Sequence, residues 1–108
     1  MQRVWRTVTG FYHVCARGVG KQLIFEGDED RWEFLELMRE CCREAGVTVI
    51  AWCLMGNHVH LVLADYEDAM SAAMHRLLLT YARRFNKRTG RTGHLFQNRF
   101  DRRSLDTD

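Results

Sequence analysis

Residues 47–64 read VTVIAWCLMGNHVHLVLA, and this stretch decides the fold. Val47 to Met55 is rich in β-branched and aromatic residues, which favour a strand. Gly56-Asn57 is a two-residue hairpin signal, and His58 to Ala64 is a second strand of mostly apolar residues. The stretch is therefore predicted to form an antiparallel hairpin within a sheet.

Two histidines lie on the second strand of this hairpin, separated by one residue. Because a strand points residues i and i+2 to the same face, the rings of His58 and His60 are expected to stand side by side. Val59, Leu61 and Leu63 are expected to point the other way, into a core. Neutral imidazole is a common ligand of divalent metals, and two fixed donors provide half of a site. For the pair alone, a solvated sheet face without a ligand is the alternative.

The flanking segments complete an α+β domain. A strand is expected at Phe11 to Arg17, and a helix from about Asp28 to Ala45, where Gly46 ends it. A second helix is expected from about Asp68 to Lys87, and a short last strand within Leu95 to Phe100. This order predicts the ferredoxin-like βαββαβ fold, a four-stranded antiparallel sheet with both helices on one face. The two histidines are then expected on the other, open face.

The composition is that of one globular domain, since 46% of the 108 residues are apolar and 28% are charged. No apolar run approaches the ~18 residues that a membrane span needs. No apolar segment follows the basic N-terminus, as it would in a secretory signal. The four cysteines lack Cys-x-x-Cys spacing and are expected to be reduced core residues of a cytoplasmic protein.

Positive charge is concentrated at one end of the chain. Residues 1–75 hold 7 Lys/Arg and 11 Asp/Glu, whereas residues 76–108 hold 9 and 3. A basic end suits a polyanion, usually nucleic acid, and a solvated helix face is the alternative. Phe96 and Phe100 are expected either to stack on unpaired bases or to fill the core. The side chains expected to contact phosphates are those of Arg83, Arg84, Lys87, Arg88, Arg91, His94 and Arg99.

The three tyrosines are the residues to consider as nucleophiles. A tyrosine nucleophile needs a phosphate held by a metal in line with its phenolic oxygen. Tyr81 lies on the apolar stripe of the second helix, where a core aromatic is the favoured interpretation. Tyr66 lies in a loop near the histidines in sequence, and Tyr12 is opposite in phase to His13. His13 is a candidate for a further polar group on the open face.

Several separate motifs resemble those of the REP-associated tyrosine transposases, which belong to the single-tyrosine HUH transposases and nucleases. They occur in the family's order and cover nearly the whole chain from about residue 8. The matching segments are FYHV at 11–14, ARG at 16–18, AWCLM at 51–55, NHVHL at 57–61, YARRFN at 81–86 and GHLFQNRF at 93–100.

The resemblance implies a ferredoxin-like catalytic domain that acts on single-stranded or hairpin DNA in the cytoplasm, in association with the nucleoid. It implies that His58 and His60 hold a divalent ion, Mg²⁺ or Mn²⁺, which polarises the scissile phosphate. A tyrosine attacks, giving a 5′-phosphotyrosine and a free 3′-hydroxyl, and another hydroxyl can reverse the step. The basic end of the second helix and the segment from Gln97 to Phe100 match regions suited to DNA contact.

The chain departs from the family after this segment. The family's nucleophilic tyrosine lies on a further helix, whereas this sequence ends at residues 104–108, SLDTD, and Tyr81 matches a different, non-nucleophilic tyrosine. The expectation is a single HUH transposase-like domain, residues 1–108, that lacks the C-terminal helix and is inactive or impaired in cleavage. A non-catalytic nucleic-acid-binding module of the same fold is the alternative, and a bare metal-binding domain is a third. Apolar surface exposed by the missing helix would allow a homodimer.

Overall fold

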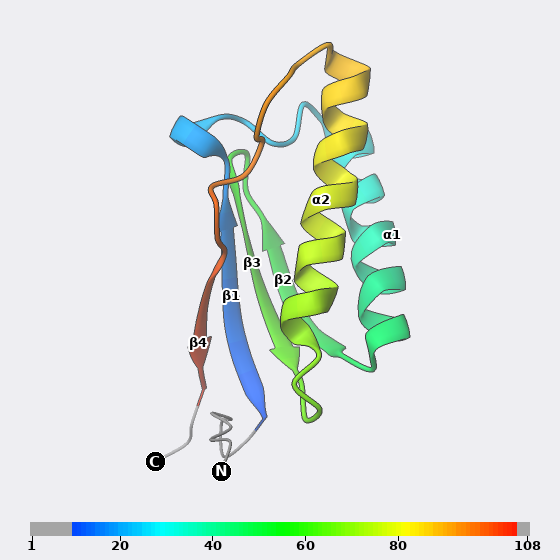
Figure 1. Ribbon diagram of the computed structural model, residues 1–108, viewed down its shortest axis with the longest axis vertical. Helices are drawn as coiled ribbons and strands as arrows, with labels where there is room; N and C mark the ends of the chain where they lie inside the picture. The colour runs from blue at the N-terminus through cyan, green and yellow to red at the C-terminus, as the bar shows by residue number, and fades with distance from the viewer. Residues whose placement is uncertain (1–9, 106–108) are drawn as a thin grey trace.

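A computed structural model describes residues 10–105, which form one antiparallel sheet with two helices packed on one side of it (Figure 1). The predicted α+β, ferredoxin-like βαββαβ order is confirmed. Across the sheet the strands lie in the order β2-β3-β1-β4. The elements are β1 (Phe11–Arg17), the 3₁₀ turn η1 (Val19–Lys21), α1 (Asp28–Ala45), β2 (Thr48–Leu54), β3 (His58–Ala64), α2 (Met70–Thr89) and β4 (Asp101–Ser104).

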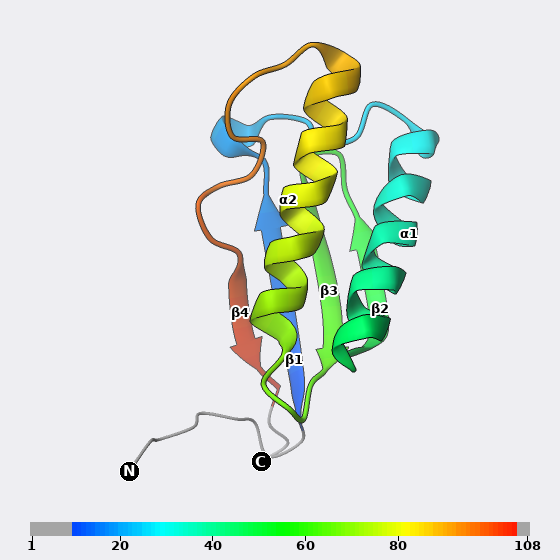
Figure 2. The ribbon, with the colours of Figure 1, turned by 45° about the vertical axis from the view of Figure 1, so that its right-hand side comes forward.

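The core lies between the sheet and the helices. In Figure 2, α1 passes in front of β2, α2 passes in front of β1, and β4 lies beside α2 with no helix over it. Each helix contributes one apolar stripe, as the 3.6-residue period predicts. The buried residues of α2 are Met70, Ala73, Met74, Leu77, Tyr81 and Phe85.

The predicted hairpin is confirmed, and it forms β2 and β3. The backbone N–H of Met55 donates to the carbonyl of His58 at 2.8 Å, which closes the turn. Gly18 donates to Asn57 and Ile24 to Gly56, both at 2.9 Å, so the turn is also tied to the segment after β1. The start of β3 is therefore held both by the hairpin turn and by the segment after β1.

Asp65 joins the end of β3 to the start of α2. Its side chain is only 3% exposed. The carboxylate accepts hydrogen bonds from the backbone N–H groups of Glu67, Ala69 and Met70 at 3.3, 3.1 and 2.8 Å. These donors at the beginning of a helix have no intrahelical partners, and a carboxylate there also favours the helix dipole.

The last strand does not lie where the sequence predicted it. Leu95 and Phe96 are neighbours and are both buried, at 1% and 8% exposure. Two adjacent buried side chains break the alternation of a strand, and Phe96 forms only an isolated bridge with Gly18. The strand follows as β4 (Asp101–Ser104), a fully exposed and charged edge strand.

Three of the four cysteines are buried as predicted, whereas Cys53 is exposed, and none forms a disulfide. Between residues 10 and 105, neither helix is both long and apolar enough to cross a membrane.

Candidate functional site

His58 and His60 project together from β3 onto the face of the sheet that carries no helix. Their ring centroids are 4.9 Å apart and their planes are nearly perpendicular, at 87°. Both side chains are half-buried, while Val59 and Leu61 between and beside them are fully buried on the other face. The predicted orientation of the pair is therefore confirmed.

One nitrogen of each ring is already engaged. Nδ1 of His58 lies 2.8 Å from Oδ1 of Asn57. Because an amide oxygen only accepts, His58 donates this hydrogen bond from Nδ1 and keeps its lone pair on Nε2. Nδ1 of His60 lies 3.1 Å from Nε2 of His13, a residue of β1, and the two rings stack with centroids 5.2 Å apart. A metal-binding histidine typically donates the N–H of its second nitrogen to a neighbouring acceptor, and His60 would do so from Nδ1 to Nε2 of His13.

His60 sits in surroundings that favour its neutral form. Burial lowers its pKa from the usual 6.5, and the neighbouring His58, His13 and Arg17 lower it further. A metal ligand must be the neutral imidazole, because the protonated ring has no lone pair to donate. These surroundings therefore keep His60 neutral at neutral pH, so that its lone pair is available to a metal ion.

The histidine pair fits a cation that takes most of its ligands from outside the protein. Within residues 10–105, no group of three or more His, Cys, Asp or Glu side chains is arranged to hold a metal. Asp65, the nearest acid along the chain, is buried and occupied at the end of α2. The pair would supply two nitrogens, and water or phosphate oxygens would complete the shell, as Mg²⁺ and Mn²⁺ accept.

The tyrosines lie away from this pair. Tyr81 is fully buried, and its hydroxyl donates to the carbonyl of Ile24. Burial, followed by the charge of Asp30, raises the pKa of Tyr81 well above its usual value. These surroundings support the core role that its apolar stripe predicted.

The rings of Tyr12 and Tyr66 also lie against other parts of the protein. Tyr12 is 4% exposed on the core face of β1, with the guanidinium of Arg102 over its ring at 5.7 Å from the centroid. Tyr66 follows the end of β3 that is remote from His58, and its ring lies against Gly10. A Cβ at Gly10 would come within 2.1 Å of that ring, and the φ of +78° there also favours glycine.

The basic residues of α2 divide into paired and unpaired sets. Arg84 lies 3.5 Å from Glu33, and Arg88 forms ion pairs with Glu26 and Asp30, so these guanidiniums join α2 to the beginning of α1. Among the described residues, Arg83 and Lys87 of α2 form no ion pair, and neither does Arg99, which lies between α2 and β4. DNA contact stays a prediction for all of them, and among residues 10–105 no carboxylate competes with a phosphate for the unpaired ones.

Arg91 and His94 belong to the loop between α2 and β4. The Arg91 guanidinium donates to the carbonyl of His94 at 2.7 Å and to that of Gly93 at 3.2 Å. The side-chain amide of Asn86 also donates to Gly93 at 2.8 Å. Arg91 therefore shapes the loop, while the side chains of His94 and Gln97 remain exposed.

Four of the predicted nucleic-acid contacts line one groove beside α2, namely Arg83, His94, Gln97 and Arg99. The structure adds Ser71, His75 and Arg102 to its walls. Sequence patterns did not indicate Ser71 or His75 as wall residues, because their place depends on how α2 packs beside β4.

The open face does not carry the stacked aromatic rings that an RNA-recognition-type module would need. Among residues 10–105, strand alternation and pairing place on that face of the two central strands the imidazoles of the histidines, other polar or aliphatic side chains, and one phenyl ring, that of Phe11, at one end. The residues are Phe11, His13, Cys15 and Arg17 on β1 and His58, His60 and Val62 on β3.

Comparison with known proteins adds three findings. A family profile described as "Transposase IS200 like" matches residues 7–108. A solved REP-associated tyrosine transposase bound to a REP hairpin has 13% sequence identity and a TM-score of 0.73, over 100% of this chain and 63% of that one. A candidate transposase from Deinococcus radiodurans R1 has 18% identity and a TM-score of 0.67, over 97% and 83%. No curated protein matches the chain.

Proposed function

The chain belongs to the IS200-like transposase family, and we propose that it is a DNA-binding domain of the HUH single-strand nuclease type. The observation that carries this proposal is the placement of His58 and His60. They stand side by side on the open face of the sheet, and the Nδ1 atom of each is already engaged. The chain spans 63% of the length of the REP-associated transposase, so the activity of a whole transposase is itself part of the proposal.

The proposed cofactor is Mg²⁺ or Mn²⁺, held by the Nε2 atoms of His58 and His60. When bound, such an ion polarises a phosphate oxygen and stabilises the charge that develops there. The protein supplies the orientation, because Asn57 and His13 fix the two rings. Arg17 is paired with His58 across β1 and β3, and its exposed guanidinium provides positive charge for a phosphate on the same face.

The proposed partner is single-stranded or hairpin DNA, acted on in the cytoplasm in association with the nucleoid. The similar REP-associated transposase is bound to a REP hairpin, and this supports hairpin DNA as the substrate class. In this chain the unpaired arginines beside α2 offer the charge, and the groove beside them offers apolar surface. Both are features that unpaired nucleotides require.

Strand cleavage by these residues alone is proposed to be absent or impaired. Cleavage of this type forms a bond from a tyrosine oxygen to phosphorus and breaks the bond to the 3′-oxygen, which leaves as a hydroxyl. Tyr12 and Tyr81 are buried, and Tyr66 lies against Gly10 beyond the end of β3. From these placements we infer that none of the three presents its phenolic oxygen to a phosphate at the histidine pair.

The metal site is tested by titrating the protein with Mn²⁺ and following the electron paramagnetic resonance signal of the free ion. His58→Ala and His60→Ala are expected to weaken binding at least tenfold. His13→Ala removes the hydrogen bond and the ring stacking to His60 and is expected to cost about tenfold. His75→Ala is the matched control, because His75 is exposed on α2 and away from the pair. Unchanged Mn²⁺ binding by His60→Ala would contradict the proposal.

The cleavage step is tested with a labelled hairpin oligonucleotide and Mn²⁺ on a denaturing gel. No covalent adduct is expected with the 108-residue chain. An adduct that disappears in Tyr66→Phe would show that a tyrosine of this chain does reach the phosphate.

A homodimer stays a prediction. In the sheet formed by residues 10–105, β2 is an edge strand, and its Ile50 and Trp52 are 52% and 53% exposed, which favours association between sheet edges. Sedimentation equilibrium of the wild type and of Trp52→Lys tests this edge, because the charge is expected to abolish a dimer formed through it.

A further inference from the structure

A groove runs along α2 on the helix side of the sheet, opposite to the histidine face. Its walls are α2 and the segment 93–102, and its volume is about 990 Å³. Protein pockets for organic ligands have volumes of roughly 300–1,000 Å³, so this one can hold more than a single small group. The apolar residues that line it are Leu78, Leu79, Ala82, Leu95, Phe96 and Phe100.

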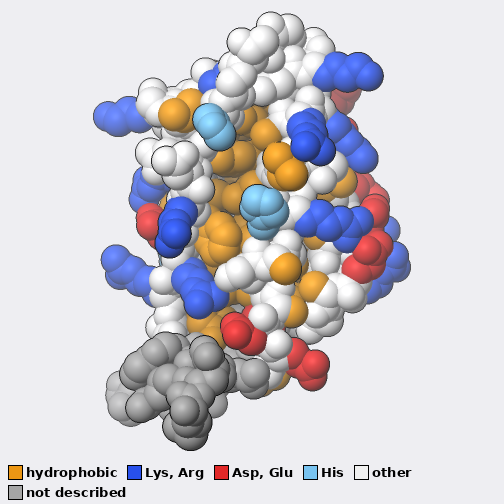
Figure 3. All heavy atoms as spheres, in the orientation of Figure 1, with side chains coloured by type: hydrophobic (Ala, Val, Ile, Leu, Met, Phe, Trp, Pro, Cys, Tyr) orange, Lys and Arg blue, Asp and Glu red, His pale blue; other side chains and the backbone are white. Residues whose placement is uncertain are grey.

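The apolar floor is open to solvent. Leu79 is 42% exposed, and Phe100 is half-buried. In Figure 3 hydrophobic side chains run down the middle of this face, with Lys and Arg side chains on both sides of them. Leucine and phenylalanine side chains exposed in one groove are costly in water and favour a ligand with a flat apolar surface.

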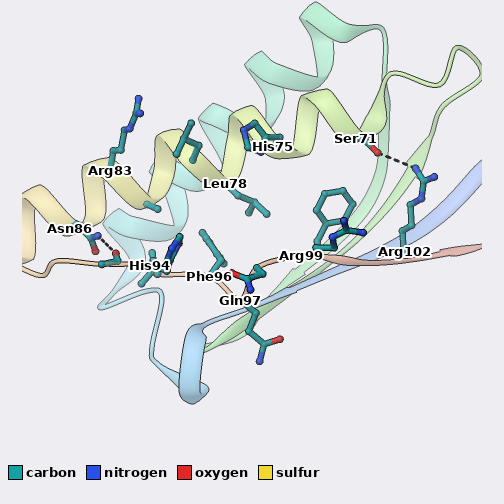
Figure 4. A pocket seen from close by; sticks show the side chains of 16 residues that line it. Ser71, His75, Leu78, Arg83, Asn86, His94, Phe96, Gln97, Arg99 and Arg102 are labelled. Atoms are coloured by element: carbon teal, nitrogen blue, oxygen red, sulfur yellow. Dashed lines mark hydrogen bonds between the residues drawn. The ribbon is translucent and has the colours of Figure 1, made fainter.

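All charged residues that line the groove are basic. Arg83, Arg99 and Arg102 contribute to the walls, with His75 and His94, and no Asp or Glu lies among the sixteen lining residues. Figure 4 shows Arg83 and His75 on α2, and Arg99 and Arg102 on the segment across from them. A ligand that suits the groove therefore carries negative charge at its edges and an apolar surface at its centre.

The arginines differ in how they are held. Arg102 donates to the hydroxyl of Ser71 at 3.2 Å, which ties β4 to the first turn of α2. Arg83 and Arg99 form no ion pair within residues 10–105. Arg84, the next residue on α2, is instead paired with Glu33. The charge of Arg83 and Arg99 at the groove is thus left available, while the charge of Arg84 is paired with Glu33 on the α1 side.

The wall opposite α2 is preorganised. Asn86 and Arg91 hold the carbonyls of Gly93 and His94, as described above, and the N–H of Gln97 donates to the carbonyl of Arg17 at 2.9 Å. A wall fixed in advance loses little conformational freedom when a ligand binds.

We propose that this groove, which we call the α2 groove, binds unpaired nucleotides of single-stranded DNA. The bases lie on Leu79 and Phe100, and Arg83 and Arg99 contact the flanking phosphates. A duplex shows only phosphates and base edges, whereas an unpaired nucleotide also shows the flat base that the apolar floor requires. This inference rests on the proposed function for the nature of the partner, and it adds a surface separate from the histidine pair.

The test measures the fluorescence anisotropy of a labelled dT₁₂ oligonucleotide in EDTA, so that the metal site makes no contribution. Arg83→Ala and Arg99→Ala are each expected to weaken binding about fivefold or more, and Leu79→Glu about thirtyfold. Arg43→Ala is the matched control, because Arg43 is an exposed arginine on α1 without an ion pair among the described residues. It is expected to stay within twofold of the wild type. Thermal melting of each variant checks that it is folded.

A second probe separates the contribution of the bases to affinity from that of the phosphates. An abasic twelve-mer with the same number of phosphates is expected to bind at least tenfold more weakly than dT₁₂, since the base stacks on the floor. Equal affinity for the two oligonucleotides would overturn the proposal, as would equal affinity of Leu79→Glu and the wild type.

The outcomes distinguish this inference from the proposed function. If the wild type binds dT₁₂ but the groove variants bind it equally well, the α2 groove is wrong and the DNA-binding domain stands. If Leu79→Glu changes the oligomeric state and not the DNA affinity, the groove is an interface between copies and the proposal is wrong. If the wild type binds no DNA, both are wrong. Mn²⁺ binding by His60→Ala is measured separately, and its loss is expected to leave dT₁₂ binding in the α2 groove unchanged.

Discussion

Replacing Tyr81 by phenylalanine tests whether this tyrosine stabilises the fold or acts as a nucleophile. The hydroxyl of Tyr81 donates to the carbonyl of Ile24, and both residues are fully buried. Without the hydroxyl, that carbonyl loses this donor in a site closed to water. Leaving a buried polar group unsatisfied costs about 1–3 kcal/mol, so Tyr81→Phe is expected to lower the free energy of unfolding by that amount.

The ring of Tyr81 contributes more than its hydroxyl. It lies 5.3 Å from the ring of Phe34, 5.7 Å from Phe25, 6.0 Å from Phe85 and 6.3 Å from Phe96, between centroids. Truncation of a buried aromatic side chain costs about 3–5 kcal/mol, and Tyr81→Leu, which keeps part of the volume, is expected near the lower end of that range. The two variants together divide the stabilisation between the hydrogen bond and the packing of the ring.

Thermal unfolding followed by circular dichroism measures both variants. One kcal/mol corresponds to about 4–8 °C in the melting temperature of a domain near this size, so Tyr81→Phe is expected to melt at least about 4 °C lower. Its affinity for dT₁₂ is expected to be unchanged. A Tyr81→Phe protein with wild-type stability would refute the hydrogen-bond argument. Loss of a DNA adduct in that variant would refute the structural role.

Three further predictions follow from other residues. Asp65→Ala removes the acceptor of three backbone N–H groups and is expected to lower the free energy of unfolding by about 2–3 kcal/mol in a urea titration. Burial raises the pKa of Cys42 to about 11, so iodoacetamide at pH 8 is expected to modify exposed Cys53 and to spare Cys42, as mass spectrometry would show. The two phosphate contacts of Arg83 and Arg99 predict a slope of about −1.4 for log K of dT₁₂ binding against log salt, and Arg99→Ala should reduce its magnitude by about 0.7. A slope near zero would contradict contact with phosphates.

Sequence patterns predicted the parts of the fold that depend on neighbouring residues. β3 and α1 have the predicted bounds, because the alternation of His58 to Ala64 and the spacing of apolar residues in α1 are local signals. The last strand was placed too early, because Leu95 and Phe96 are as apolar as a strand but fill the end of the core together. Whether two adjacent apolar residues are both buried depends on the space that α2 and β1 leave between them.

The sequence also predicted the orientation of the histidine pair, which follows from the two-residue period of a strand. It did not show which atoms hold the rings. The contact between His13 and His60 joins residues 47 positions apart and depends on the register of β1 against β3. The same limit applies to the arginines, because the packing of α1 against α2 decides that Arg84 and Arg88 are paired while Arg83 is not.

β4 carries neighbouring arginines to opposite sides of one layer. Arg103 is paired with His13 and shares the face of the histidines, whereas Arg102 is paired with Val14 and turns toward α2. A DNA strand that touched both the histidine pair and the α2 groove would have to pass around this outer edge, because the sheet itself blocks a direct path. Such a strand would meet positive charge on the histidine face, at the β4 edge and in the α2 groove. We therefore expect oligonucleotides too short to make that turn to occupy one surface at a time.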